Sequence, residues 1–131
     1  MACFCTIASG SSGNCTYIGS GVGGILVDVG VSCKGILTAL RSRDIDPESV
    51  RGIFITHEHI DHIKGLRVLL KKLEVPVYAT EEVLSFLADH DHLPAGARAY
   101  GHPHQNFVGV GHRFLKFYLW QDKQVWNLCD L

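Results

Sequence analysis

A stretch of seven residues, Thr56-His57-Glu58-His59-Ile60-Asp61-His62, constrains this chain more than any other part of its sequence. It holds three histidines and two carboxylates, in a chain of which 19% of the residues are charged. The residues before it, Arg51 to Thr56, include an unbroken apolar run and predict a buried strand. The residues after it, Ile63 to Leu73, have apolar side chains at helical spacing and lysines in the last turn. The stretch is therefore expected on a turn between a strand and a helix, where α/β sheets place their ligand sites.

The spacing within this stretch suits metal ligation. His57 and His59 are two residues apart, so on an extended turn both can point toward one ion. Asp61 and His62 follow at the start of the helical region and can face a second ion. Two ions roughly 3.5–4 Å apart would bind a bridging hydroxide and the oxygens of a substrate. The alternative is a solvated polar loop with a helix cap, but such loops favour Ser, Asn and Lys and seldom gather three histidines.

The string from Thr56 to His62 resembles the H-x-H-x-D-H motif of the metallo-β-lactamase-fold hydrolases. Three flanking segments, Ala8 to Cys15, Leu26 to Gly30 and Pro76 to Thr80, are similar to the bacterial exonuclease-like branch of that superfamily, often called YycJ-like. The resemblance runs from about Phe4 to Phe86 and is looser beyond.

The resemblance implies an α/β (α+β) fold, a partial αββα sandwich of the metallo-β-lactamase type with the metal loop at one edge of the sheets. Residues 1–131 would form a single domain that corresponds to the N-terminal part of the family's domain. In the family, further strands, helices and a last ligand histidine follow the stretch that ends here at Leu131, so the chain is expected to lack them.

Asp28 closes the apolar run from Ile25 to Val27, where a charge must be paired or solvated. By resemblance it is the family's aspartate beside the metal site, which fixes the histidine loop through hydrogen bonds. This role agrees with the need of ligand imidazoles to have their other N–H group held. A plain strand-end or cap residue is the alternative.

The resemblance to the metallo-β-lactamase-fold hydrolases becomes clear again in the last third of the chain. The segment Pro103 to Phe114 looks like the family's ligand histidine followed by a strand, which assigns His104, with His102 as its competitor. The segment Val125 to Leu131 looks like the strand that ends in the aspartate bridging both metals, which assigns Asp130. The metal ligands expected from the motif and the resemblance are therefore His57, His59, Asp61, His62, His104 and Asp130, and those expected to act in catalysis are Asp61, His57 and His59.

Three other histidines have simpler interpretations. His90 and His92 flank Asp91 and could supply a ligand, but solvated residues at a helix end are favoured. His112 lies in an apolar strand, where a core or surface histidine is favoured.

These features predict a metal-dependent hydrolase, of a phosphodiesterase or exonuclease-like kind, that acts on nucleic acid through a metal-activated hydroxide. Two divalent ions are expected, and histidine with carboxylate suits zinc, manganese or iron. Two alternatives stay open. The first is that the chain is a catalytically silent metal-binding fragment, which would self-associate through an incomplete sandwich. The second is that it hydrolyses thioesters or lactones on the same fold.

Composition limits the kinds of partner. The formal net charge is −1 and no basic block stands out, so a strong electrostatic footprint for nucleic acid is absent from the sequence. A nucleic-acid substrate would be held by the metals and by local lysines such as Lys64, Lys71 and Lys72. No charged leader with a following apolar run is present and no apolar stretch reaches 18 residues, so a cytoplasmic protein without membrane contact is expected.

The five cysteines are odd in number and contain no C-x-x-C pair, which favours buried thiols in a reducing compartment over a disulfide or zinc site. Two glycine-rich turns could be mistaken for phosphate-binding loops, but neither is followed at once by a helix. The remaining expected elements are strands at 1–7, 15–18, 25–28 and 75–79, a helix from Cys33 to about Arg43 capped by Ser32, a helical turn at 46–48, and a helix at 81–88 capped by Thr80.

Overall fold

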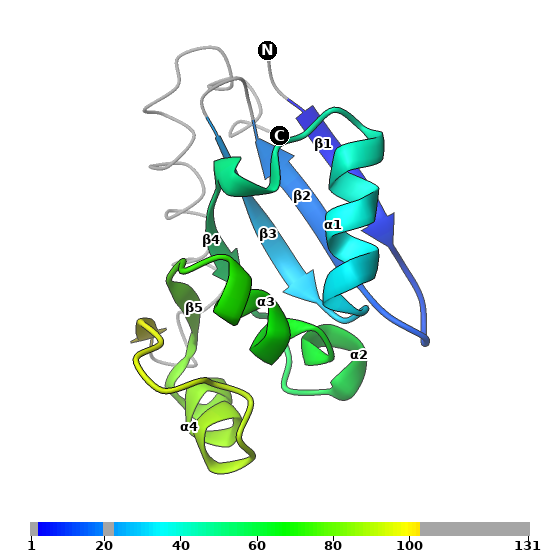
Figure 1. Cartoon of the computed structure of the whole chain (residues 1–131). Coiled ribbons are helices and arrows are strands. Elements are labelled where there is room, and N and C mark those ends of the chain that lie inside the picture. Colours follow the sequence, from blue (N-terminus) through cyan, green and yellow to red (C-terminus); the bar gives the residue numbers. More distant parts are fainter. Residues whose placement is uncertain (1–2, 20–22, 103–131) are drawn as a thin grey trace.

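The computed structural model describes residues 3–19 and 23–102 of the chain. Within these residues six strands form a single sheet in the order β1-β2-β3-β4-β5-β6 (Figure 1). The first three strands pair antiparallel, and β3 to β6 pair parallel. The strands are β1 Cys3–Ala8, β2 Cys15–Gly19, β3 Gly24–Val29, β4 Val50–Phe54, β5 Val77–Thr80 and β6 Ala99–His102.

Helices make the crossovers between the parallel strands, which confirms the expected α/β fold. The first helix lies over one face of the sheet (Figure 1). Both predicted caps are present, because the hydroxyl of Ser32 accepts from the N–H of Gly35 at 3.1 Å and that of Thr80 from the N–H of Val83 at 3.2 Å. The helices are α1 Cys33–Ser42, η1 Pro47–Ser49, α2 Ile60–Ile63, α3 Leu66–Lys72 and α4 Glu81–Asp89.

The main core lies between the helices and one face of the sheet. The register aligns Cys5, Tyr17, Leu26, Ile53 and Val77 across five strands on that face. Against it pack apolar side chains of the helices, among them Ile36, Leu40, Leu66, Leu69 and Leu87, all of which are fully buried.

The opposite face of the sheet is also apolar. Ile25 and Phe54 are buried there, and the ring of Tyr78 stacks between those of Phe54 and Tyr100, with centroids 6.3 and 5.3 Å away. A parallel sheet with two apolar faces is typical of the inner layer of a layered α/β fold.

The structure differs from the sequence prediction in the helix after the motif. It begins at Ile60, close to the expected start, but it is interrupted between α2 and α3. The interruption falls at Gly65, where a Cβ atom would lie 2.2 Å from the carbonyl oxygen of Val31. The backbone of Gly65 instead donates to the carbonyl of Val29 at 2.8 Å, so this turn packs directly on the end of β3.

Two further expectations need correction. The strand β6 was not predicted, because Ala99-Tyr100-Gly101-His102 is short and contains a glycine. Cys15 and Cys33 are buried as expected, but Cys3 is exposed, since it lies on the edge strand β1.

In the part of the chain that the structure describes, no helix is both long enough and apolar enough to cross a membrane.

Candidate metal site

The motif lies at the carboxyl ends of the adjacent parallel strands β3 and β4. Ile55, directly after β4, is fully buried and donates its N–H to the carbonyl of Tyr78 at 2.9 Å. The chain then leaves the sheet, and α2 contacts the end of β3. The side chains of His57 and His59 are exposed, whereas the inward-facing Ile63 is buried. The loop is therefore anchored at both ends, while the imidazoles of His57 and His59 are exposed.

Asp28 is the centre of the hydrogen bonds that hold this loop. The residue is 6% exposed and has a left-handed backbone with φ of 60°, which aspartate tolerates better than most residues. Its Oδ1 accepts from the N–H of Thr56 at 2.8 Å, and its Oδ2 accepts from the Thr56 hydroxyl at 2.6 Å. The same Oδ2 lies 2.8 Å from Nδ1 of His62. One buried carboxylate thus holds both ends of the motif.

These bonds determine which ring nitrogen of two histidines carries the proton. A carboxylate can only accept, so Nδ1 of His62 must be the donor to Asp28. The Thr56 hydroxyl donates its one hydrogen to Asp28. Its oxygen must therefore accept from Nδ1 of His57, 2.9 Å away. In both rings the proton is on Nδ1, which leaves the Nε2 lone pair available to a metal ion.

Asp61 is held by Asn14, a residue of the β1–β2 turn for which the sequence predicted no functional role. The backbone N–H of Asn14 donates to the Asp61 carbonyl at 2.7 Å, and its side-chain amide donates to Oδ2 of Asp61 at 3.1 Å. The same Oδ2 is 3.6 Å from Nε2 of His62. No local pattern could have shown this role, because Asn14 and Asp61 are 47 residues apart.

A glycine allows this close approach. A Cβ atom on Gly30 would lie 1.6 Å from the carbonyl oxygen of Asp61 and 2.8 Å from the backbone nitrogen of Asn14. The N–H of Gly30 donates to the carbonyl of Asn14 at 2.8 Å. The β1–β2 turn, the end of β3 and the start of α2 therefore meet backbone to backbone beside the motif.

The predicted ligands are brought together only in part. The ring of His57 has its centroid 4.8 Å from that of His62 and 5.9 Å from that of His59. Among residues 3–19 and 23–102, no group of three or more His, Cys, Asp or Glu side chains is placed to hold one ion. The predicted ligands His104 and Asp130 lie outside the described residues, so the full ligand set stays a prediction.

The donors that are present fit a divalent metal ion in their chemistry. Imidazole nitrogens with free lone pairs and a carboxylate are the ligands that zinc, manganese and iron share. The nearby Cys15 does not add a thiolate, because burial, and secondarily the charge of Asp28, raises the pKa of its thiol to about 12. The site is thus a nitrogen and oxygen site in the described part of the chain.

The second histidine cluster is a helix end, as expected. His90 follows the last turn of α4, where its Nδ1 donates to the carbonyl of Phe86 at 3.0 Å and its ring stacks on the Phe86 ring with centroids 3.9 Å apart. The adjacent Asp91 is 83% exposed and pairs with Arg67 of α3 at 2.5 Å. These contacts fix the loop after α4.

Comparison with known proteins places these features in a wider group. The chain matches the family model described as the metallo-beta-lactamase superfamily over residues 8–127. It is 46% identical over 79 residues to the exodeoxyribonuclease YycJ of Bacillus anthracis, a match that covers 60% of this chain and 30% of that protein. It is 40% identical over 87 residues to the exodeoxyribonuclease WalJ of Streptococcus pneumoniae, covering 66% of this chain and 32% of that one. The matched region thus spans about a third of each of these curated relatives.

Solved structures support the same fold. A B3 metallo-β-lactamase with an active-site glutamic acid superposes with a TM-score of 0.60 at 24% identity, covering 74% of this chain and 41% of that one. The Rm3 metallo-β-lactamase has a TM-score of 0.56 at 27% identity, with 63% of this chain and 31% of that chain covered. In both cases the superposed region corresponds to less than half of the larger protein.

Proposed function

The chain belongs to the metallo-beta-lactamase superfamily, and from this membership and the geometry of residues 56–62 we propose that it is a metal-dependent phosphodiesterase of an exonuclease-like kind. The observation that carries the proposal is the bond network from Asp28 to the motif, which leaves the Nε2 lone pairs of His57 and His62 available to a metal ion. A plain polar loop has no need of a buried carboxylate that fixes two imidazole rings.

The role of each residue follows from its contacts. His57, His59, Asp61 and His62 would hold two divalent ions, with His104 and Asp130 completing the set. Such ions supply Lewis-acid chemistry and lower the pKa of a bound water. Asp28 keeps the rings of His57 and His62 in the ligand tautomer, and Asn14 directs the Asp61 carboxylate toward His62.

The proposed substrate is a phosphodiester bond in nucleic acid, and the support comes from the relatives named exodeoxyribonucleases. A cytoplasmic location is proposed with it, because Cys3, Cys5, Cys15 and Cys33 are free thiols. The choice of zinc or manganese and the presence of two ions belong to the same proposal.

Removal of one ligand tests the proposal. We expect His57→Ala to lower both the bound metal, measured by inductively coupled plasma mass spectrometry, and the turnover of bis-p-nitrophenyl phosphate. The loss of turnover should be at least about 100-fold, since even residues that only orient a ligand are worth 10–100-fold. The matched control is His90→Ala, which removes an exposed histidine of the α4 end.

Three results would contradict the proposal. The first is metal content and turnover in His57→Ala equal to those of the wild type. The second is an equal loss in His90→Ala. The third is wild-type turnover of thioester or lactone substrates together with none of the phosphodiester, which would move the chain to a different substrate class.

A further inference from the structure

A stripe of side chains on the outer side of α2 and α3 begins inside the metal loop. Ile60 and Val68 are large hydrophobic residues that are 62% and 50% exposed. Lys64, between them in sequence, and Lys71, further along, are also exposed. We call Ile60, Lys64, Arg67, Val68 and Lys71 the outer stripe.

The stripe crosses the interruption between α2 and α3, where the backbone stays in the right-handed helical region although the N–H of Gly65 donates to Val29 of β3. Lys64 and Gly65 both have right-handed helical backbone angles. The N–H of Lys64 donates to the carbonyl of Ile60 at 3.0 Å, and that of Leu69 donates to the carbonyl of Gly65 at 3.0 Å. Residues spaced by three and four along such a backbone lie on one side of it. The opposite side is buried, with Ile63, Leu66, Leu69 and Leu70 in the core.

The charge of the outer stripe is positive and largely uncompensated. In the described part of the chain, neither Lys64 nor Lys71 forms an ion pair, and Arg67 is paired with Asp91. The chain as a whole has a net charge of −1, so this positive stripe is a local feature. Exposed aliphatic side chains beside exposed lysines form a surface that suits an anionic chain with apolar groups attached to it.

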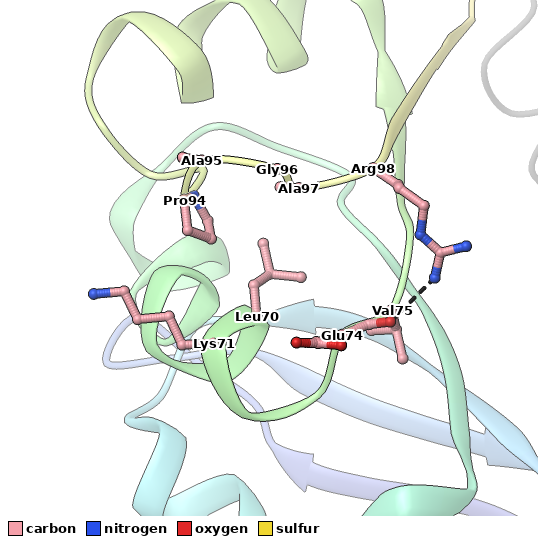
Figure 2. Close-up of a pocket in the computed structure, with 9 residues that line it drawn as sticks. All are labelled: Leu70, Lys71, Glu74, Val75, Pro94, Ala95, Gly96, Ala97 and Arg98. Atoms are coloured by element: carbon pink, nitrogen blue, oxygen red, sulfur yellow. Dashed lines mark hydrogen bonds between the residues drawn. The ribbon is translucent and has the colours of Figure 1, made fainter.

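The outer stripe connects the metal loop at one end to a pocket at the other. Ile60 stands between His59 and Asp61, so one end is within the metal loop. From Ile60 to Lys71 the helical rise is about 16 Å, the length of a few nucleotides. At the other end Lys71 borders a pocket of about 580 Å³ between α3 and the segment 94–98, which Figure 2 shows above Leu70. Its charged lining residues are Lys71, Glu74 and Arg98, and its size suits a small ligand such as one nucleotide.

We propose that the outer stripe binds a single strand of nucleic acid and leads it to the metal loop, with the pocket beside Lys71 receiving a nucleotide at the far end. Lys64 and Lys71 contact phosphates, and Ile60 and Val68 contact base faces. A single strand is favoured over a duplex, because the base faces that the two aliphatic side chains would touch are accessible only when bases are unpaired. This inference rests on the proposed phosphodiesterase function, since that function supplies the reason for a nucleic acid at the loop.

The test measures binding apart from turnover. Fluorescence anisotropy of a labelled oligothymidylate is recorded in EDTA over a range of salt concentrations for the wild type, Lys64→Gln and Lys71→Gln. We expect each substitution to weaken binding several-fold at low salt and to reduce the slope of log affinity against log salt by about 0.7. The matched control is Lys72→Gln, because Lys72 is the neighbour of Lys71 but lines a different pocket, together with Leu37 and Arg41 of α1.

The outcomes distinguish failure of the proposed binding to the outer stripe from failure of the proposed phosphodiesterase function. The proposed binding of nucleic acid to the outer stripe would be overturned if Lys64→Gln, Lys71→Gln and Lys72→Gln all lost binding equally, or if none of them lost it. It would also be overturned if Lys64→Gln and Lys71→Gln weakened binding to phosphatidylserine vesicles but not to the oligonucleotide. Turnover of bis-p-nitrophenyl phosphate is measured in parallel with metal present. We expect it to be unchanged in the control Lys72→Gln, because Lys72 lies outside both the motif and the outer stripe. If the wild type fails to turn it over, the proposed function fails, while the binding experiment still decides whether the stripe holds nucleic acid.

Discussion

Asp28→Asn is expected to weaken metal binding by about 10–100-fold, although Asp28 itself does not touch the metal. The amide keeps the size of the carboxylate and tolerates the left-handed backbone at φ 60°, but it replaces one acceptor oxygen with a donor. An amide nitrogen in place of Oδ2 would face Nδ1 of His62 and favour the wrong tautomer of that ring. In place of Oδ1 it would oppose the N–H of Thr56. Zinc or manganese affinity by isothermal titration calorimetry measures the effect.

The same substitution is expected to lower the free energy of unfolding by about 1–3 kcal/mol, because a buried polar group loses its partner. The matched control is Asp44→Asn, since Asp44 has nearly the same backbone angle, φ 57°, but is exposed. The control should bind metal like the wild type. Wild-type metal affinity in Asp28→Asn would contradict the role given to the carboxylate.

Gly30→Ala is expected to destabilise the protein by about 3 kcal/mol or more and to abolish tight metal binding. The new methyl group would lie 1.6 Å from the Asp61 carbonyl oxygen, and the contact is with backbone on both sides, so no side-chain rotation can relieve it. The start of α2 would have to move away from β3, which breaks the bond from the N–H of Asn14 to the Asp61 carbonyl. Chemical denaturation followed by circular dichroism measures the loss.

Gly35→Ala is the control for this second prediction. Gly35 lies in the exposed side of α1, where a Cβ atom would meet the Ser32 hydroxyl at 3.1 Å and no backbone atom. The gain in helix propensity and the tighter contact are each within about 1 kcal/mol, so its stability should stay close to that of the wild type. An equal loss of stability in both variants would mean that the contact between Gly30 and Asp61 is not special.

Much of the fold was predictable because its signals are local. The apolar run before Thr56, the caps Ser32 and Thr80, and the buried stripe of α1 each depend on neighbours in sequence, and each is present in the structure. The interruption between α2 and α3 was missed because it depends on the packing of Gly65 against the end of β3, which is a tertiary contact. The strand β6 was missed because it is defined by pairing with β5, which is a tertiary contact.

The candidate site shows the same division. The motif gave the donor atoms, and the family resemblance pointed to Asp28. The sequence could not give the hydrogen bonds of Asn14 to Asp61, since they join the β1–β2 turn to α2 through the packing at Gly30. His104 and Asp130, which lie outside the described residues, stay predictions.

Asp28 and Thr56 fix the protons of the His57 and His62 rings on Nδ1, and the metal site depends on this tautomer. Long-range ¹H–¹⁵N correlation spectra of the metal-free protein at about pH 8, above the ordinary imidazole pKa, report this tautomer for each histidine. We expect both His57 and His62 to carry the proton on Nδ1, with Nε2 unprotonated. Spectra in which either ring carries its proton on Nε2 would contradict it.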